Sequence, residues 1–310
     1  MMTATQVPTA EHGEETVAPV TGGRRWSFPR WATATVGFVA VLVVLAVVWE
    51  AYKAFGQAVG DTFPGTSLSL PVSTDDRSMP HLLTIVRELG EPATRGSTTS
   101  LLGYLLVETS VTLRTAFYGL VLGSGVGWIL AVVISEARVA NRAFMPWLIA
   151  SQTVPLVAIA PMVVIWGGAA GLPVWASVTF MAAYLAFFPV TINAARALRS
   201  VQPVQLDVLR AAGAGRVTTL RLLRLPASLP FLFAGLRLAA TSAVVGAIVG
   251  ELSAGTGRGV GRSILTFAYY YSSGPAKLYA AVLVAALAGI VFVQAIALLE
   301  AFVLRHRPSS

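Results

Sequence analysis

The chain carries, from Gln205 to Pro230, the stretch QLDVLRAAGAGRVTTLRLLRLPASLP. The stretch is basic and interrupted by glycine, and long apolar segments flank it on both sides. Pro203 suits the first turn of a helix, and Gly213 suits the left-handed cap that follows a last turn. A second helix is expected to begin after Gly215 and to end at Pro226. We therefore predict two short helices joined by a glycine-containing elbow, in a loop between two apolar segments.

The composition around this loop is that of a membrane protein. Of the 310 residues, 55% are hydrophobic and 12% are charged, whereas a soluble domain carries about 25% charged residues. Several uncharged runs reach the roughly 20 residues that a transmembrane helix needs, and they lack the alternation of a transmembrane barrel. The chain has no cysteine and only three histidines, so neither a thiolate nor a histidine metal site is expected. The excess of arginine lies mostly between the apolar runs, which does not point to nucleic acid.

The order of these runs predicts an all-α membrane protein with six transmembrane helices and both termini in the cytoplasm. Residues 1–30 are expected to form a disordered cytoplasmic tail, and residues 31–54 the first transmembrane helix. Residues 55–104 would form an external loop, and residues 105–305 a core of five transmembrane helices with a cytoplasmic loop at 197–227. Lysine and arginine are concentrated in the segments assigned to the cytoplasm, as the positive-inside rule requires.

Two features predict how the core helices are built. Gly119, Gly123 and Gly127 recur at every fourth position, which leaves one helix face without side chains and lets another helix pack closely. The third span is expected to be kinked or interrupted, because it contains three prolines; these are Pro146, Pro155 and Pro161.

At the external side the expectations are simpler. The segment His81 to Leu89 has helical apolar spacing and is expected to form a short amphipathic helix on the membrane surface. Glu108 and Arg114 are expected to face the lipid headgroups or to pair with each other. The glycine-rich stretch Glu251 to Pro275 lacks the lysine and the spacing of a P-loop, and is expected to be a flexible external connection. No ATP site is therefore expected in this chain.

The loop from Asp207 to Pro226 resembles the coupling motif of permease subunits of binding-protein-dependent ABC importers. That motif reads Glu-Ala-Ala, three residues, Gly, nine residues, then Ile-x-Leu-Pro. With its glycine on Gly213, its last two residues fall on Leu225 and Pro226. Asp207 stands in place of its glutamate, and the alanine pair is replaced by larger residues. The resemblance assigns contact with the ATPase to Asp207, Val208, Leu209, Gly213, Arg216, Leu223, Leu225 and Pro226.

The resemblance extends over roughly residues 80–305, and the nearest branch looks like the taurine, aliphatic-sulfonate and nitrate type. The stretches QTVPLVAIAP, AGLRLA and VGELSAGTGRGVG are similar to that branch. Some members near it are thought to carry riboflavin or thiamine-precursor pyrimidines. The resemblance implies the type I importer fold in the inner membrane, with no cofactor. The implied partners are ATP-binding subunits, an extracytoplasmic solute-binding protein and a second permease copy, within the lipid bilayer.

Polar residues in the apolar runs are candidates for the translocation path. Gln152 and Thr153 lie beside the prolines of the third span, so we hypothesise that they line the path. Asn193 is the alternative on the fourth span. Arg237 could add a positive field for an anionic solute or could extend to the membrane surface. Glu251 could be a gate or a solute contact, or a hydrated residue at the interface.

Two other classes of function remain as alternatives. A secondary transporter driven by an ion gradient usually needs ionisable residues inside the membrane, and the third, fourth and sixth spans have none. A membrane-embedded enzyme would need clustered histidines, cysteines or carboxylates, which the sequence lacks. Dependence of uptake on ATP would separate an ABC importer from a secondary transporter.

Overall fold

A computed structural model describes residues 30–63, 68–94, 96–255 and 257–305. The predicted cytoplasmic tail and the C-terminal end lie outside these residues. The described chain is almost entirely helical, with two isolated β-bridges, Thr62 with Ser69 and Pro92 with Ser100. The predicted all-α fold class is therefore confirmed. The elements in order are α1 (Arg30–Val59), α2 (Leu82–Glu88), α3 (Leu101–Glu136), α4 (Arg138–Thr153), α5 (Leu156–Ala169), α6 (Val174–Arg199), α7 (Pro203–Ala211), α8 (Arg216–Thr219), η1 (Leu220–Arg224), α9 (Leu225–Ser253), α10 (Val260–Tyr269), η2 (Tyr271–Ser273) and α11 (Pro275–Leu304).

Among the described residues, five helical runs are long and apolar enough to cross a membrane, and a bent pair of helices brings the number to six. The bent pair is α4 and α5, which meet at an angle of 95°. The chain divides into two compact units, residues 1–51 and residues 52–310. In the first unit, the described part is a single apolar helix, which continues to Val59 and so exceeds the predicted limit at residue 54.

Small residues form the core of the second unit, where α3, α6 and α9 pack together. The most buried positions of α6 and α9 are alanines, including Ala182, Ala186 and Ala243. The glycines of α3 face α6: a Cβ at Gly119 would lie 2.3 Å from the Cβ of Ala182, and one at Gly123 would lie 2.6 Å from the carbonyl oxygen of Ala183. The predicted close helix contact is confirmed, since no side chain fits at these positions.

Replacing Gly123 by valine is expected to destabilise the bundle. The new side chain would meet the backbone of α6, which cannot move aside as a flexible side chain would. Overpacking of this kind costs about 1–3 kcal/mol or more. Gly125→Val is the matched control, because nothing lies within 4 Å of a Cβ at Gly125. Thermal unfolding in detergent should show a midpoint several degrees lower for Gly123→Val alone; equal midpoints would contradict this packing.

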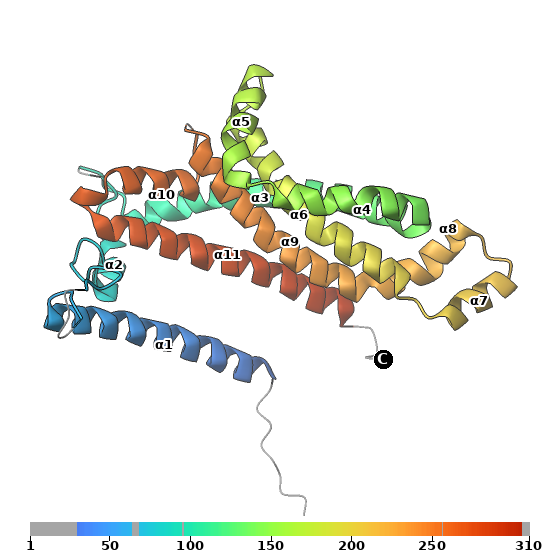
Figure 1. Ribbon diagram of the computed structural model, residues 1–310, viewed down its shortest axis with the longest axis horizontal. Helices are drawn as coiled ribbons and strands as arrows, with labels where there is room; N and C mark the ends of the chain where they lie inside the picture. Colours follow the sequence, from blue (N-terminus) through green and yellow to red (C-terminus); the bar gives the residue numbers. More distant parts are fainter. Residues whose placement is uncertain (1–29, 64–67, 95, 256, 306–310) are drawn as a thin grey trace, which may run out of the picture. The chain divides into compact units, whose positions relative to one another are not determined.

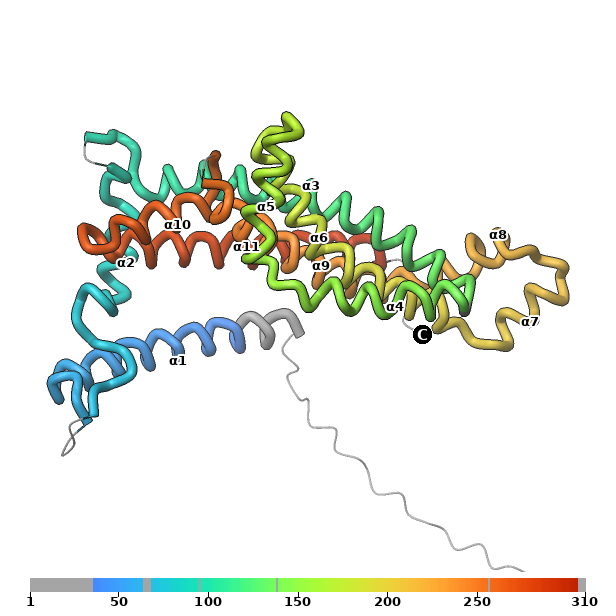
Figure 2. Tube along the Cα trace, turned by 45° about the horizontal axis from the view of Figure 1, so that its top comes forward, coloured from blue at the N-terminus to red at the C-terminus, as the bar shows by residue number. Residues whose placement is uncertain are grey.

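The two ends of the second unit carry different elements. Figures 1 and 2 show α7 and α8 projecting from one end, while α2 and α10 lie at the opposite end. This arrangement agrees with a cytoplasmic loop at one membrane surface and external segments at the other. Helix α2 forms within the predicted segment, but it is not isolated on a membrane surface. Its Ile85 is buried with Leu101 of α3 and Ala281 of α11, whereas Val86 is 56% exposed, so protein covers part of the apolar face.

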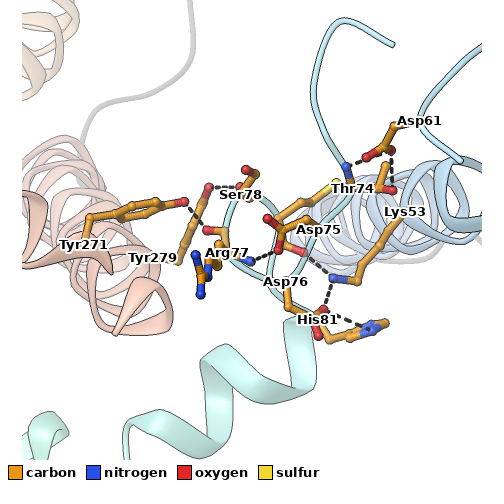
Figure 3. Close-up of polar contacts among 11 residues, drawn as sticks. Lys53, Asp61, Thr74, Asp75, Asp76, Arg77, Ser78, His81, Tyr271 and Tyr279 are labelled. Atoms are coloured by element: carbon orange, nitrogen blue, oxygen red, sulfur yellow. Dashed lines mark hydrogen bonds and ion pairs between the residues drawn. The ribbon is translucent and has the colours of Figure 1, made fainter. Parts of the chain in front are cut away.

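Polar contacts hold the loop before α2, which was predicted to be external (Figure 3). Lys53, at the end of α1, is fully buried, and its ammonium group contacts Asp76 Oδ1 at 2.5 Å and the carbonyl oxygen of Met79. This hydrogen bond and the positive charge of Lys53 lower the pKa of the Asp76 carboxyl from its ordinary value. On the other side, the hydroxyl of Tyr279 donates to the carbonyl oxygen of Ser78 at 2.5 Å. The loop is therefore attached to both α1 and α11.

The predicted flexible connection from Glu251 to Pro275 is wrong for most of its length. It contains α10 and the short helix η2. Glycine and serine in this stretch suggested flexibility, but Val260 is 1% exposed and Gly261 is buried. The glycines serve close packing instead: a Cβ at Gly259 would lie 2.1 Å from the carboxyl carbon of Glu251.

Candidate coupling loop and translocation site

The predicted elbow has the geometry of a glycine-capped helix end. Helix α7 begins at Pro203, and Gly213 follows its end with a φ of 74°. The N–H of Gly213 donates to the carbonyl of Arg210 at 3.0 Å, and the N–H of Ala214 donates to the carbonyl of Leu209 at 2.9 Å. This pair of bonds is the Schellman motif, which needs a left-handed residue that glycine adopts without strain. The chain can then reverse into α8 after Gly215.

The surface of α7 is open. None of its residues is buried, and Val204 and Val208 are 71% and 63% exposed. Asp207 forms an ion pair with Arg210 at 3.1 Å on the same helix, with both side chains exposed. An exposed valine pair on a charged helix that projects from the bundle is a surface suited to contact with another protein.

The second half of the loop departs from the prediction at Pro226. We expected this proline to end the helix, but α8, η1 and α9 continue as one helical run from Arg216 to Ser253. Residues Leu220–Arg224 form a π-helical turn, in which the N–H of Leu225 bonds to the carbonyl of Leu220. A π turn widens the helix, and Pro226 in the first turn of α9 needs no donor of its own. Motion of α8 can therefore reach α9 through a continuous helix.

The predicted ATPase-contact residues fall on successive parts of this loop. Asp207, Val208 and Leu209 lie on α7, whereas Gly213 forms the elbow. Arg216 lies on α8, Leu223 in the π turn, and Leu225 and Pro226 at the start of α9. Beneath the loop is a cavity of about 270 Å³. At its wall Arg224 contacts Glu136 of α3 at 2.5 Å, which ties the loop to the bundle.

The break in the third span lies at Val154 and Pro155. Pro155 lacks the N–H that would donate a helical hydrogen bond to the carbonyl of Ser151, four residues earlier. The hydroxyl of Tyr184 on α6 donates to this carbonyl at 2.5 Å. Gln152 and Thr153 are exposed beside the break. The prolines Pro146 and Pro161 lie inside α4 and α5 without breaking them.

The other candidate path residues make contacts within the chain. Asn193 donates from Nδ2 to the carbonyl of Pro189 at 2.8 Å and packs against Gly235. Arg237 pairs with Glu300 of α11, with 3.1 Å between Nε and Oε2. These two side chains are therefore partnered within the chain, as is Thr153, whose hydroxyl donates to the carbonyl of Ala150 at 2.8 Å.

Glu251 belongs to a buried network that the sequence did not reveal. Its Oε2 accepts from the hydroxyl of Thr112 and from the N–H of Gly261, both at 2.9 Å. The hydroxyl of Thr112 also accepts from the N–H of Val260 at 2.8 Å. Glu251 is 3% exposed, so the expectation of a hydrated interfacial residue is wrong.

A second carboxylate holds the same loop. Glu108 accepts from Arg258 Nη2 at 2.8 Å and from the N–H of Gly259 at 2.7 Å. Neither expectation for Glu108 holds: its side chain is buried rather than facing the headgroups, and its ion-pair partner is Arg258 rather than Arg114. Glu108 and Thr112 are one helical turn apart on α3, and this spacing of two polar residues in an apolar span was the available signal. Together these groups fasten the start of α10 to α3 and α9; we call them the external latch, which consists of Glu108, Thr112, Glu251, Arg258, Gly259, Val260 and Gly261.

Comparison with known proteins identifies the family of this chain. Residues 123–305 match the family described as binding-protein-dependent transport system inner membrane component. The riboflavin transport system permease protein RibX of Chloroflexus aurantiacus is 36% identical over 46% of this chain and 54% of its own length. The putative aliphatic sulfonates transport permease protein SsuC of Bacillus subtilis is 28% identical over 67% of this chain and 72% of its own length.

A solved structure of the MetNI methionine ABC transporter, in inward-facing conformations, shares the fold. It is 18% identical, covers 75% of this chain and 100% of its own, and has a TM-score of 0.50. The chain spans between 53% and 56% of the length of three curated relatives that are 34% to 36% identical. The family match covers more than half of the chain, and the chain has the several apolar helices of a multi-pass inner-membrane protein. The chain belongs to the family of inner-membrane components of binding-protein-dependent transport systems, the permeases of ABC importers.

Proposed function

We propose that this chain is the membrane-spanning permease of an ATP-driven importer that moves a small organic solute across the inner membrane. The observation that carries this proposal is the coupling loop: an exposed α7, a Schellman elbow at Gly213, and an α8 that continues into α9 without a break. A force applied to α7 and α8 would be passed along α9 as a rigid element. The bundle would then rock between outward-open and inward-open states.

The proposed partners follow from the two ends of the bundle. ATP-binding subunits would grip the exposed valines of α7 and hydrolyse the ATP. A solute-binding protein would deliver the solute at the opposite end, beside α10. One chain has one such loop, and a pair of ATPases needs two, so a second copy of the permease is part of the proposal.

We propose that the solute passes the break between α4 and α5, where Gln152 and Thr153 lie exposed. A bend of 95° with an interrupted helix is tolerated in a membrane where it lines a cavity rather than lipid. Asn193 packs against Gly235 and Arg237 is paired with Glu300 of another helix, which makes them weaker candidates. Glu251 would act from the latch, without touching the solute.

For the solute, we favour an uncharged heterocycle of the riboflavin or pyrimidine kind over a sulfonate or nitrate. Glu300 neutralises Arg237, so this arginine would not supply a free cation for an anionic solute. Among the relatives, 36% identity to RibX exceeds 28% identity to SsuC. A sulfonate remains the second candidate, because SsuC matches a larger share of this chain.

Replacing Gln152 by leucine is expected to reduce ATP-dependent uptake several-fold, because the path loses a hydrogen-bonding group. Basal ATP hydrolysis and assembly should stay unchanged, since the side chain is exposed and, within the described part of the chain, bonds to its neighbour Ser151 alone. The measurement is uptake of radiolabelled riboflavin and of taurine, offered separately to cells that express the complete transporter. The effect of the variant tests the path, and the solute that is taken up tests the solute class.

Gln294→Leu is the matched control for this prediction. Gln294 is exposed on α11 and lines a separate groove of about 670 Å³ between α9 and α11. Uptake that survives Gln152→Leu but is lost in Gln294→Leu would move the path to that groove. Uptake driven by an ion gradient without ATP would remove the importer proposal altogether.

A further inference from the structure

A second feature lies between α4 and α6, in residues that belong neither to α7 and α8 nor to the break at Val154 and Pro155. A groove of about 350 Å³ runs between these helices. We call it the α4–α6 groove; it is lined by Asn141, Met145, Ile149, Phe188, Ile192, Ala195, Arg196 and Arg199. Its two halves differ in chemistry, because the polar residues come from the first turn of α4 and the last turn of α6.

The polar half of the groove is cationic. Arg196 is exposed and has no hydrogen bond or ion pair among the described residues. Arg199 donates to the carbonyl of Ile134, but a guanidinium has five N–H donors and can serve a further acceptor. None of the described residues that line the groove is acidic, and Glu136, which follows Ile134 on α3, is held by Arg224. The two arginines therefore offer donors to a negatively charged group.

Asn141 adds a buried polar atom at the same end. Its Oδ1 is sealed from solvent and has no hydrogen-bond partner. A buried amide oxygen without a partner is costly. Because Asn141 lines the groove, a turn of its side chain toward the groove would let this oxygen accept from the hydroxyl group of a ligand. The polar half thus combines donors for an oxyanion with an acceptor for a hydroxyl.

The remaining half of the groove is apolar and follows the helices away from this end. Met145 and Ile149 lie on α4, and Phe188 and Ile192 lie on α6. Ile149 is 56% exposed, so its side chain is open to contact with a lipid chain. Free phosphate would leave this half empty, whereas a lipid chain would fill it.

We propose that the α4–α6 groove binds an anionic phospholipid of the inner leaflet whose headgroup carries a hydroxyl, such as phosphatidylglycerol. Arg196 and Arg199 would bind the phosphate, Asn141 would accept from the headgroup hydroxyl, and an acyl chain would lie along Met145, Ile149, Phe188 and Ile192. The site lies at the inner end of the bundle, since α6 leads from there into the coupling loop. Basic pockets between transmembrane helices on this side suit anionic headgroups.

Native mass spectrometry of the full-length chain in detergent tests the site, with phosphatidylglycerol and phosphatidylcholine of identical acyl chains as probes. We expect the wild type to retain phosphatidylglycerol preferentially. Arg196→Gln should weaken its binding about fivefold, the scale expected for one arginine at an anionic surface. Arg221→Gln is the matched control, because Arg221 is an exposed arginine on η1 that does not line the groove.

Two further arms separate the possible sources of the phosphate. Glycerol 3-phosphate, which has the charge but no acyl chain, should not compete with the lipid, and Ile149→Asn should weaken lipid binding with both arginines in place. Equal binding of the two lipids, an equal loss in Arg221→Gln, or competition by glycerol 3-phosphate would each overturn the proposal. Far-UV circular dichroism of each variant confirms that it is folded.

Discussion

Replacing Gly213 by proline is expected to lower ATP-driven uptake at least tenfold while leaving the chain inserted in the membrane. Gly213 has a φ of 74°, and proline is fixed near −65°. Proline also removes the N–H that bonds to the carbonyl of Arg210. Strain of this kind costs about 1–3 kcal/mol, so the elbow would rebuild and α7 would point in another direction. Uptake and transport-stimulated ATP hydrolysis measure the loss.

Two companion variants isolate the elbow as the cause. Gly215→Ala should behave as wild type, because Gly215 has a φ of −72° and a Cβ there meets nothing within 4 Å. Gly213→Asn should retain more uptake than Gly213→Val, because asparagine tolerates the left-handed region better than a β-branched residue does. Normal uptake by Gly213→Pro, with the protein at its usual level, would exclude this loop as the site of coupling.

The helix and glycine elbow of the candidate coupling loop were predictable because their signals are local. Pro203 and Gly213 each impose a backbone conformation through their own covalent structure, and the glycines of α3 reveal their packing by spacing alone. The break beside Pro155 followed from the same rule, since proline removes a donor wherever it stands. The fold class needed only the length of the apolar runs and the low content of charge.

The π turn before Pro226 was not predictable in this way. Proline usually ends or kinks a helix, and the sequence gives no sign that a wider turn lets the helix continue. The structure shows it through one bond, from the N–H of Leu225 to the carbonyl of Leu220. This single difference turns two separate helices into one run from α8 to α9.

The external latch was missed because its members are distant in sequence. Thr112 and Glu251 are 139 residues apart, and Glu108 and Gly259 are 151 residues apart. Single carboxylates near the ends of spans usually face water or headgroups, so the sequence alone did not predict a buried network. The glycines around Gly259 suggested a mobile loop, whereas they let the backbone approach the carboxylate of Glu251.

Replacing Thr112 by valine is expected to open the external latch. Valine keeps the shape of threonine but cannot donate to Glu251 Oε2 or accept from the N–H of Val260. Each buried group left without its partner costs about 1–3 kcal/mol. The amide protons of Val260 and Gly261 should therefore exchange with solvent at least about tenfold faster, which hydrogen–deuterium exchange with mass spectrometry measures.

Thr109→Val provides the matched control, since Thr109 is buried one turn away on the same helix and its hydroxyl has no partner. This variant should leave exchange in α10 unchanged. The latch joins α10 to α3 and α9. If these helices move as one body during transport, the latch has to stay intact. Uptake should therefore fall in Thr112→Val but not in Thr109→Val. Equal exchange rates in the two variants would mean that the hydroxyl of Thr112 does not hold the loop. Faster exchange with undiminished uptake would instead show that α10 can detach from α3 and α9 during transport.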